Sequence, residues 1–161
     1  MTYTEKEGDL FDYGDGRCLV HCISADFALG KGIAAEFQRR FQTKDRLRER
    51  YKDYLSGYRE EKLLGDCLPV DGVMNLVTKE RYWGKPTYQS METALQAQKR
   101  LCRQEGIEGL AMPCIGCGLD RLAWGKVSAM IREVFSDTAC DILVVTGRSQ
   151  TPNSLVKKAD S

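Results

Sequence analysis

Short apolar runs alternate along this chain with stretches in which apolar residues have helical spacing. Residues Cys18 to Ile23 form an almost unbroken apolar run, which is typical of a central strand covered on both faces. Similar runs bounded by turn formers predict the other strands, and a turn at Asp71-Gly72 joins two of them. The predicted strands span Tyr3 to Phe11, Cys18 to Ile23, Leu63 to Val70, Val73 to Thr78, Leu110 to Met112 and Ile142 to Thr146.

Between these runs, apolar residues recur three or four positions apart, as they do on one face of a helix. The clearest helix follows Pro86-Thr87, with Thr87 as its cap and Gly106 as its stop. The predicted helices span Ile33 to Phe41, Lys44 to Lys62, Thr87 to Gly106 and Trp124 to Ser136. The second of them is rich in charge, so it is interpreted as a solvated amphipathic helix, with nucleic-acid binding as the alternative.

Strands that alternate with helices predict an α/β fold, with a mainly parallel sheet covered by helices on both faces. The antiparallel pair around Asp71-Gly72 makes the predicted sheet mixed, in three α/β/α layers. A length of 161 residues fits one domain. We expect this domain to span residues 1–147, followed by a polar tail without periodicity at residues 148–161.

Composition and charge exclude several classes of protein. The chain is 42% hydrophobic and 29% charged, and no apolar run approaches the roughly 18 residues of a membrane span. The N-terminal residues lack an apolar signal segment, so we expect an intracellular protein, cytoplasmic or nuclear, without a membrane partner. A net charge of +1 argues against a strong sequence-independent grip on nucleic acid, although it leaves room for a local basic patch. We expect a monomer.

The seven cysteines and the single histidine raise the question of metal binding or nucleophilic catalysis. An odd number of cysteines without a signal segment indicates reduced thiols more than disulfides. Cys114 and Cys117 have metal-like spacing, but a closed zinc site needs two further ligands, so we expect no metal. His21 lies inside an apolar run, which favours a hydrogen-bonded interior residue over a catalyst. Cys22 and His21 are neighbours on one strand and would point to opposite faces, which disfavours a nucleophilic pair.

Two glycine-rich loops each follow a predicted strand and precede a predicted helix. The first includes Gly30-Lys31-Gly32, and the second spans Pro113 to Asp120. Glycines let a backbone approach a ligand closely, and a helix N-terminus offers unpaired N–H groups, so such loops can cradle phosphates. The alternative is a tight connection without a ligand. The first loop completes neither of two known nucleotide-binding motifs. The dinucleotide fingerprint needs an acidic residue at the end of a second strand, which this chain lacks. The P-loop needs a first glycine and a Ser or Thr after its lysine, and this chain has neither. Two cradles suggest a ligand with two phosphates.

Six motifs, in this order along the chain, resemble those of the macrodomains. They are Gly8-Asp9-Leu10, His21-Cys22-Ile23-Ser24, Gly30-Lys31-Gly32-Ile33-Ala34, Thr78-Lys79, Lys85-Pro86-Thr87-Tyr88, and Ile115-Gly116-Cys117-Gly118-Leu119-Asp120-Arg121-Leu122. The likeness covers residues 3 to 146 and is greatest to the terminal ADP-ribose protein glycohydrolases, which cleave ADP-ribose from acidic side chains.

The resemblance implies a site for ADP-ribose and a role for each matching residue. Lys79 and Asp120 match the family's catalytic lysine and aspartate, and Asp9 would accept a hydrogen bond from the adenine amine. The loops would wrap the diphosphate and the distal ribose. The implied ligand-binding residues are Asp9, Leu10, Ser24, Gly30, Lys31, Gly32, Ile33, Ala34, Thr78, Ile115, Gly116, Cys117, Gly118 and Leu119.

The resemblance also implies partners and leaves competing functions open. No cofactor or metal is implied, and the expected partners are ADP-ribose, ADP-ribosylated proteins and ADP-ribosylated nucleic acid. The chain has Val145 where the compared macrodomain has a tyrosine near the adenine, which puts aromatic stacking there in doubt. The competing functions are an ADP-ribose reader without turnover and a phosphatase of ADP-ribose 1″-phosphate.

Overall fold

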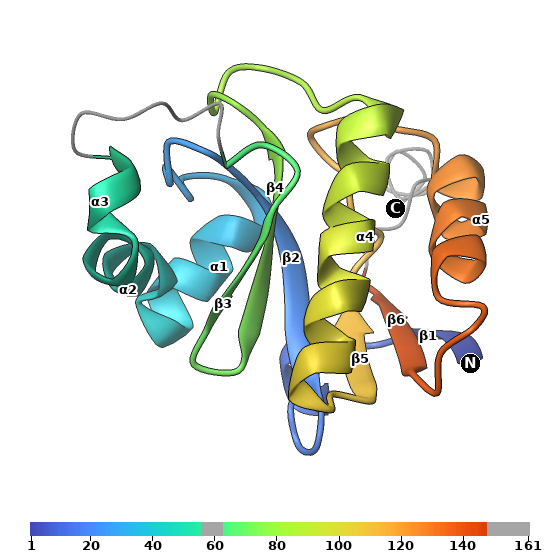
Figure 1. Ribbon diagram of the computed structural model, residues 1–161. Coiled ribbons are helices and arrows are strands. Elements are labelled where there is room, and N and C mark those ends of the chain that lie inside the picture. Colours follow the sequence, from blue (N-terminus) through green and yellow to red (C-terminus); the bar gives the residue numbers. More distant parts are fainter. Residues whose placement is uncertain (56–62, 148–161) are drawn as a thin grey trace.

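A six-stranded sheet lies between two layers of helices in the computed structural model, which describes residues 1–55 and 63–147 (Figure 1). The strands are β1 (Thr2–Glu7), β2 (Cys18–Ser24), β3 (Cys67–Val70), β4 (Val73–Lys79), β5 (Gly109–Met112) and β6 (Asp141–Thr146). The helices are the 3-10 helix η1 (Leu10–Tyr13), α1 (Gly32–Phe41), α2 (Thr43–Arg50), α3 (Lys52–Leu55), α4 (Tyr88–Glu105) and α5 (Trp124–Val134).

The sheet order is β1-β6-β5-β2-β4-β3, and only β3 runs antiparallel to its neighbour. This confirms the predicted three-layer α/β fold with a mixed, mainly parallel sheet. Asp71 and Gly72 form the turn between β3 and β4 with φ angles of 47° and 82°. Two successive positive φ angles suit a tight hairpin, as the sequence predicted at this turn.

Helices cover both faces of the sheet, and each face has its own apolar core (Figure 1). Met91 of α4 and Ile131 of α5 pack with strand residues on one face, and Phe37 of α1 and Leu47 of α2 pack on the other. Burial on both faces explains why β2 is apolar along most of its length. Among the helices of the described residues, none combines the length and hydropathy that a membrane crossing needs.

Helix α4 shows how local sequence sets the ends of an element. The Thr87 hydroxyl accepts a hydrogen bond from the Ser90 N–H at 2.9 Å, and the Ser90 hydroxyl accepts one from the Thr87 N–H at 3.0 Å. At the other end Gly106 has the left-handed conformation, with φ 66°. Both predicted ends, the Thr87 cap and the Gly106 stop, are confirmed.

Several predicted boundaries were wrong, each for a local reason. Strand β1 ends at Glu7 because the Asp9 carboxylate accepts a hydrogen bond from the Phe11 N–H at 3.0 Å and starts η1. The predicted helix from Lys44 to Lys62 is divided at Tyr51, which leaves the helical region with φ −116° and ψ 30°. Its residues 56–62, like the predicted tail at residues 148–161, lie outside the described residues.

Two further predicted elements are shorter than the apolar pattern suggested. The predicted strand from Leu63 to Val70 begins only at Cys67, because residues 63–65 form a turn in which Gly65 has φ 87°. The last predicted helix, which was expected to reach Ser136, ends at Val134. Buried apolar residues occur in turns as well as in regular elements, so apolarity alone did not locate these ends.

His21 is a buried, hydrogen-bonded core residue, as the sequence indicated. Its Nε2 atom lies 2.5 Å from the Asn75 Oδ1 atom, and its ring stacks on Phe37 with 3.9 Å between the centroids. The Asn75 amide group donates to the Leu68 carbonyl, so Oδ1 is left as the acceptor for an Nε2–H. Burial lowers the pKa of His21 to about 4, while the hydrogen bond to Asn75 opposes part of that shift. His21 is therefore neutral at pH 7.

We expect acid to destabilise the fold through His21. Between pH 6.5 and about 4 the unfolded chain takes up a proton at this residue and the folded chain does not. The free energy of unfolding should therefore fall with pH in this window, by up to about 1.4 kcal/mol per pH unit. Urea titrations at pH 7 and pH 5 measure this loss. Between these two pH values the free energy of unfolding of His21→Phe should fall by about 2 kcal/mol less than that of the unchanged chain. An equal loss in both proteins would contradict this role of His21.

Candidate active site

Lys79 and Asp120 form a largely buried ion pair at the carboxyl edge of the sheet. The Lys79 Nζ atom lies 2.7 Å from Asp120 Oδ1, and the two side chains are only 16% and 15% exposed. Lys79 ends β4, whereas Asp120 lies in the loop after β5, and β2 separates these strands in the sheet. The loop at residues 113–123 must therefore pass the end of β2 to bring the carboxylate to the amine. The two residues are 41 positions apart in the sequence, and a strand lies between the elements that carry them. The ion pair therefore depends on the tertiary fold.

Two cysteine thiols border this ion pair, and both are held protonated. Burial raises the pKa of Cys117 to about 12, and the nearby Asp120 carboxylate raises it as well. Burial also raises the pKa of Cys22 far above its ordinary value, with Asp120 again adding to the shift. A protonated thiol is a poor nucleophile. Neither thiol is therefore available as a thiolate beside the Lys79–Asp120 pair.

The second glycine-rich loop, residues 113–122, uses its two glycines for different purposes. Gly116 has φ 77°, and a Cβ atom there would lie 2.7 Å from Met91 Cε, so the fold itself requires glycine. A Cβ atom at Gly118 would meet nothing within 4 Å. The loop is closed by a hydrogen bond from the Leu122 N–H to the Gly116 carbonyl at 2.7 Å. Gly118 is thus the glycine that leaves an open approach to the backbone.

The first glycine-rich loop, residues 25–32, meets the second. Gly32 begins α1 with φ 60°, and a Cβ atom there would lie 3.3 Å from Leu119 Cδ1. Lys31 precedes the helix and makes no capping hydrogen bond with its side chain. The Lys31 side chain therefore does not cap the first N–H groups of α1. These groups lie next to the second loop, so the helix N-terminus and that loop could bind one anion together.

Asp26 connects the first loop to the loop after β4, and sequence reasoning missed it. The Ser24 hydroxyl and the Ala28 N–H donate to Asp26 Oδ1, and the Tyr82 N–H donates to Oδ2 at 3.0 Å. The Asp26 side chain accepts from the N–H two residues on, as in an Asx-turn. This turn preference of aspartate is the sequence signal that could have indicated Asp26. Ser24, placed by the resemblance at the distal ribose, is thereby fixed in orientation.

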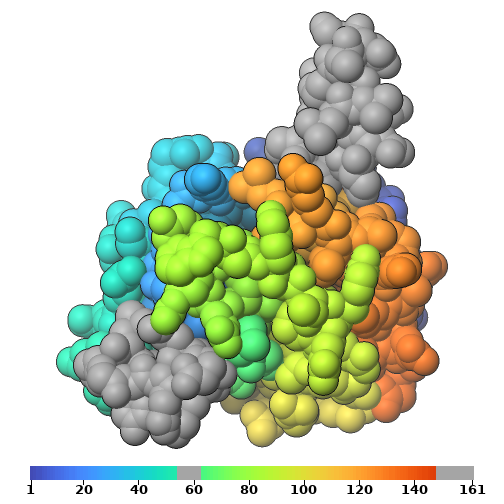
Figure 2. All heavy atoms as spheres, turned by 90° about the horizontal axis from the view of Figure 1, so that it is seen from above, coloured from blue at the N-terminus to red at the C-terminus, as the bar shows by residue number. Residues whose placement is uncertain are grey.

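The loop after β4 also holds the second glycine-rich loop. The Lys85 ammonium donates to the Leu119 carbonyl at 3.1 Å. Seen from above the carboxyl edge, the loop after β4, in green, lies beside the loop after β2, in blue, and the loop after β5, in orange (Figure 2). The loop after β4, which itself carries none of the predicted site residues, therefore joins the two glycine-rich loops into one continuous rim.

The residues assigned to adenine lie at another part of this edge. Asp9 is exposed and caps η1, whereas the Leu10 side chain is buried in the core with Phe37. Val145 is fully buried, and a Cβ atom at Gly8 would lie 3.7 Å from it and 3.3 Å from the Tyr13 hydroxyl. The backbone at Gly8 to Leu10 and the Tyr13 side chain thus border the place where the missing tyrosine was expected.

The other predicted binding residues divide by exposure. Gly30, Lys31 and Leu119 are exposed, and Ile33, Ala34 and Cys117 are half-buried. Thr78 and Ile115 are buried, so their side chains support the rim from below.

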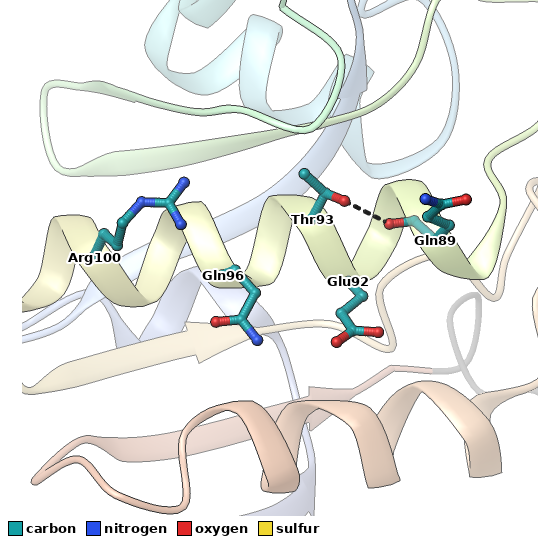
Figure 3. A pocket seen from close by; sticks show the side chains of 5 residues that line it. All are labelled: Gln89, Glu92, Thr93, Gln96 and Arg100. Atoms are coloured by element: carbon teal, nitrogen blue, oxygen red, sulfur yellow. Dashed lines mark hydrogen bonds between the residues drawn. The ribbon is translucent and has the colours of Figure 1, made fainter.

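Two surface hollows lie away from this rim. One, of about 330 Å³, lies along α4, where Figure 3 shows the side chains of Gln89, Glu92, Thr93, Gln96 and Arg100. The other, of about 410 Å³, lies near the Asp71-Gly72 turn, at the opposite end of the sheet. Neither contains Lys79 or Asp120. Among residues 1–55 and 63–147, no three His, Cys, Asp or Glu side chains are grouped as metal ligands would be.

Comparison with known proteins defines the family. The family model of the Macro domain matches residues 20–131, which include most of β2, all of β4, both glycine-rich loops and the Lys79–Asp120 pair. The chain belongs to the Macro domain family, as the six motifs indicated.

Among individual relatives, the human protein named ADP-ribose glycohydrolase OARD1 is 41% identical over 147 residues, which cover 89% of this chain and 90% of that protein. Among solved structures, the macrodomain of Mycobacterium tuberculosis DarG has a TM-score of 0.74 at 23% identity, covering 89% of this chain and 97% of that one. Thermosipho africanus DarTG in complex with ADP-ribose has a TM-score of 0.72 at 18% identity, covering 91% of this chain and 42% of that one. At these identities the structures support the fold, and the human relative carries the argument on function.

Proposed function

We propose that this macrodomain is a hydrolase that removes ester-linked ADP-ribose from acidic side chains, with Lys79 as nucleophile and Asp120 as acid and base. The 2.7 Å ion pair between these residues is the observation that carries the proposal. A relative named as an ADP-ribose glycohydrolase, similar over nearly the whole chain, supports an enzyme of this class. The thiols of Cys22 and Cys117, which border the pair, are protonated and do not compete with Lys79 as thiolates.

The proposed reaction begins with a proton transfer from the Lys79 ammonium to Asp120. Moving a proton from an ordinary lysine to an ordinary aspartate costs roughly 9 kcal/mol, because their reference pKa values differ by about 6.5, so the site with bound substrate must favour the neutral pair. A carboxylate already hydrogen-bonded to the ammonium is positioned to accept that proton. The neutral amine then attacks the anomeric carbon, the C–O bond to the substrate carboxylate breaks, and that carboxylate leaves. The nitrogen of the new C–N bond loses a proton to solvent, Asp120 gives its proton to the ring oxygen, and the ring opens to a protonated lysyl imine. Water, activated by the Asp120 carboxylate, then hydrolyses the imine to free ADP-ribose and Lys79.

The rim supplies the proposed binding groups. The N-terminus of α1, the Gly30 to Ala34 loop and the open backbone at Gly118 hold the diphosphate, and Ser24 lines the distal ribose. Asp9 receives the adenine amine. O-acetyl-ADP-ribose and ADP-ribosylated DNA present the same anomeric carbon, and they are further proposed substrates of this site. The intracellular location and the monomeric state remain predictions.

The test is incubation with a peptide that carries ADP-ribose on a glutamate ester, followed by chromatography for free ADP-ribose. The proposal predicts many turnovers per protein molecule. Binding of the peptide without release would instead indicate a reader. Release of phosphate from ADP-ribose 1″-phosphate, without cleavage of the ester, would indicate the phosphatase.

Free ADP-ribose should also stabilise the fold. A ligand that binds only the native state, at about 100 times its Kd, adds roughly 2.7 kcal/mol to the free energy of unfolding. For a domain of this size the melting temperature should rise by roughly 5–10 °C. NAD is the matched control, since a shift with NAD and none with ADP-ribose would support a dehydrogenase. No shift with millimolar ADP-ribose would exclude the proposed site.

A further inference from the structure

The first glycine-rich loop, residues 25–32, has a conformation that its own residues do not favour. Phe27 and Leu29 have φ angles of 54° and 43°, in the left-handed region, where large side chains crowd the backbone. Both side chains are buried in the core. Strained backbone of this kind clusters at functional sites and persists only where the surrounding structure determines it. Contacts from outside these two residues must therefore hold the loop.

The half-buried Asp26 supplies such contacts within the loop. Its Oδ1 atom accepts a hydrogen bond from the Ala28 N–H at 3.3 Å, across the strained Phe27, and another from the Ser24 hydroxyl. The Arg48 guanidinium of α2 donates to the Asp26 carbonyl at 3.3 Å and attaches the loop to the helical layer. Through Oδ1, Asp26 thus fixes both the hydroxyl that is proposed to line the distal ribose and the backbone that leads to the N-terminus of α1.

The second carboxylate oxygen of Asp26 holds the segment that begins with Lys79. Oδ2 accepts a hydrogen bond from the Tyr82 N–H at 3.0 Å. Three residues before Tyr82, the Lys79 carbonyl accepts a hydrogen bond from the Ala25 N–H at 2.9 Å. Residues 79–82 are therefore attached at both ends to residues 25 and 26. The proposed nucleophile and the loop proposed to bind the distal ribose belong to one hydrogen-bonded unit, with the Asp26 carboxylate between them.

We propose that Asp26 is a positioning residue, whose two carboxylate oxygens hold the first glycine-rich loop and the Lys79 segment in the relative position that hydrolysis needs. This inference rests on the proposed function. Asp26 acts through Ser24 and the Lys79 segment and does not touch the substrate. A displacement of the reacting atoms by about 1 Å can lower a rate about 100-fold. Loss of the Oδ2 contact should therefore lower the rate of the covalent step more than it lowers the affinity for ADP-ribose.

Asp26→Asn separates the roles of the two oxygens. Asparagine keeps an acceptor oxygen for the Ala28 N–H, but its NH₂ group cannot accept a hydrogen bond from the Tyr82 N–H. With saturating protein, the single-turnover rate on a glutamate-ester ADP-ribosyl peptide should fall at least about tenfold. The Kd for free ADP-ribose, measured by calorimetry, should change by less than about threefold. Asp26→Ala loses both contacts, so it should show the same loss of rate and, in addition, a roughly tenfold higher Kd.

Lys99→Ala is the matched control for a general loss of stability. The Lys99 ammonium pairs with Asp137 at 2.8 Å, in the half of α4 that lies away from the rim. This variant should have a lower melting temperature but an unchanged rate and Kd.

Three results would overturn the proposed role of Asp26. They are an unchanged rate in Asp26→Asn that circular dichroism shows to be folded, an equal fall of the rate in Lys99→Ala, and a Kd of Asp26→Asn that rises as steeply as its rate falls. Each of them leaves turnover by the unchanged chain intact. An unchanged chain without turnover would instead refute the proposed function, and this inference with it, so the two failures are distinguishable.

Discussion

Lys79→Ala should lower kcat for ester-linked ADP-ribose by about 10³-fold or more, while the Kd for free ADP-ribose changes by less than about tenfold. The amine is the proposed nucleophile, so its removal abolishes the covalent step. The ligand would still be held by the N-terminus of α1, the backbone at Gly118 and Asp9, which the substitution does not touch. Single-turnover kinetics and calorimetry on the same preparation measure the two quantities separately.

Asp120→Ala should lose a comparable fraction of kcat, and the double variant should be little worse than either single one. Groups that act in one step are strongly non-additive, and these two share a hydrogen bond of 2.7 Å. Asp120→Asn is the matched control, because it keeps the shape and removes the base. If the two losses multiply in the double variant, Lys79 and Asp120 act independently and the proposed proton transfer is wrong.

Gly118→Glu should abolish ADP-ribose binding while leaving the fold intact. A Cβ atom at this position would meet nothing within 4 Å and φ is not in the left-handed region, so we expect the backbone to accept a side chain without strain. The new carboxylate would lie where the proposed diphosphate lies, and it would also block the approach to the backbone. Calorimetry should detect no binding of ADP-ribose, and the melting temperature without ligand should be nearly unchanged.

Two other glycine variants act as controls for this result. Gly118→Ala adds bulk without charge and should retain weaker binding. Gly116→Ala should instead destabilise the fold, because φ is 77° and the new Cβ would lie 2.7 Å from Met91 Cε. Normal ADP-ribose binding by a folded Gly118→Glu would remove this loop from the site.

These contrasting glycines show how far sequence reasoning could go. The sequence predicted both glycine-rich loops, and the resemblance to macrodomains, now confirmed, implied their ligand. It treated Gly116 and Gly118 alike, because the sequence does not show that the backbone has φ 77° at Gly116 and no positive φ at Gly118. The helix ends at Thr87 and Gly106 were predictable because capping depends on neighbouring residues only.

Features that depend on long-range contacts escaped prediction. Asp26 joins two loops through the Tyr82 N–H, 56 residues away, and Lys85 joins two others through the Leu119 carbonyl, 34 residues away. The resemblance assigned Lys79 and Asp120 to one reaction, but only the sheet order shows that a loop must pass β2 to pair them. The exposure of Tyr82 and Trp83 was missed because residue type alone does not distinguish an exposed tryptophan from one in the core.

The most direct test of the central claim is to trap the proposed intermediate. Borohydride added during turnover of an ester-linked ADP-ribosyl peptide should reduce the lysyl imine, and digestion with mass spectrometry should find the ADP-ribose adduct on Lys79. Lys79→Ala should give neither an adduct nor free ADP-ribose. Turnover by Lys79→Ala at the rate of the unchanged chain, or an adduct on a different residue of the active protein, would contradict Lys79 as the nucleophile.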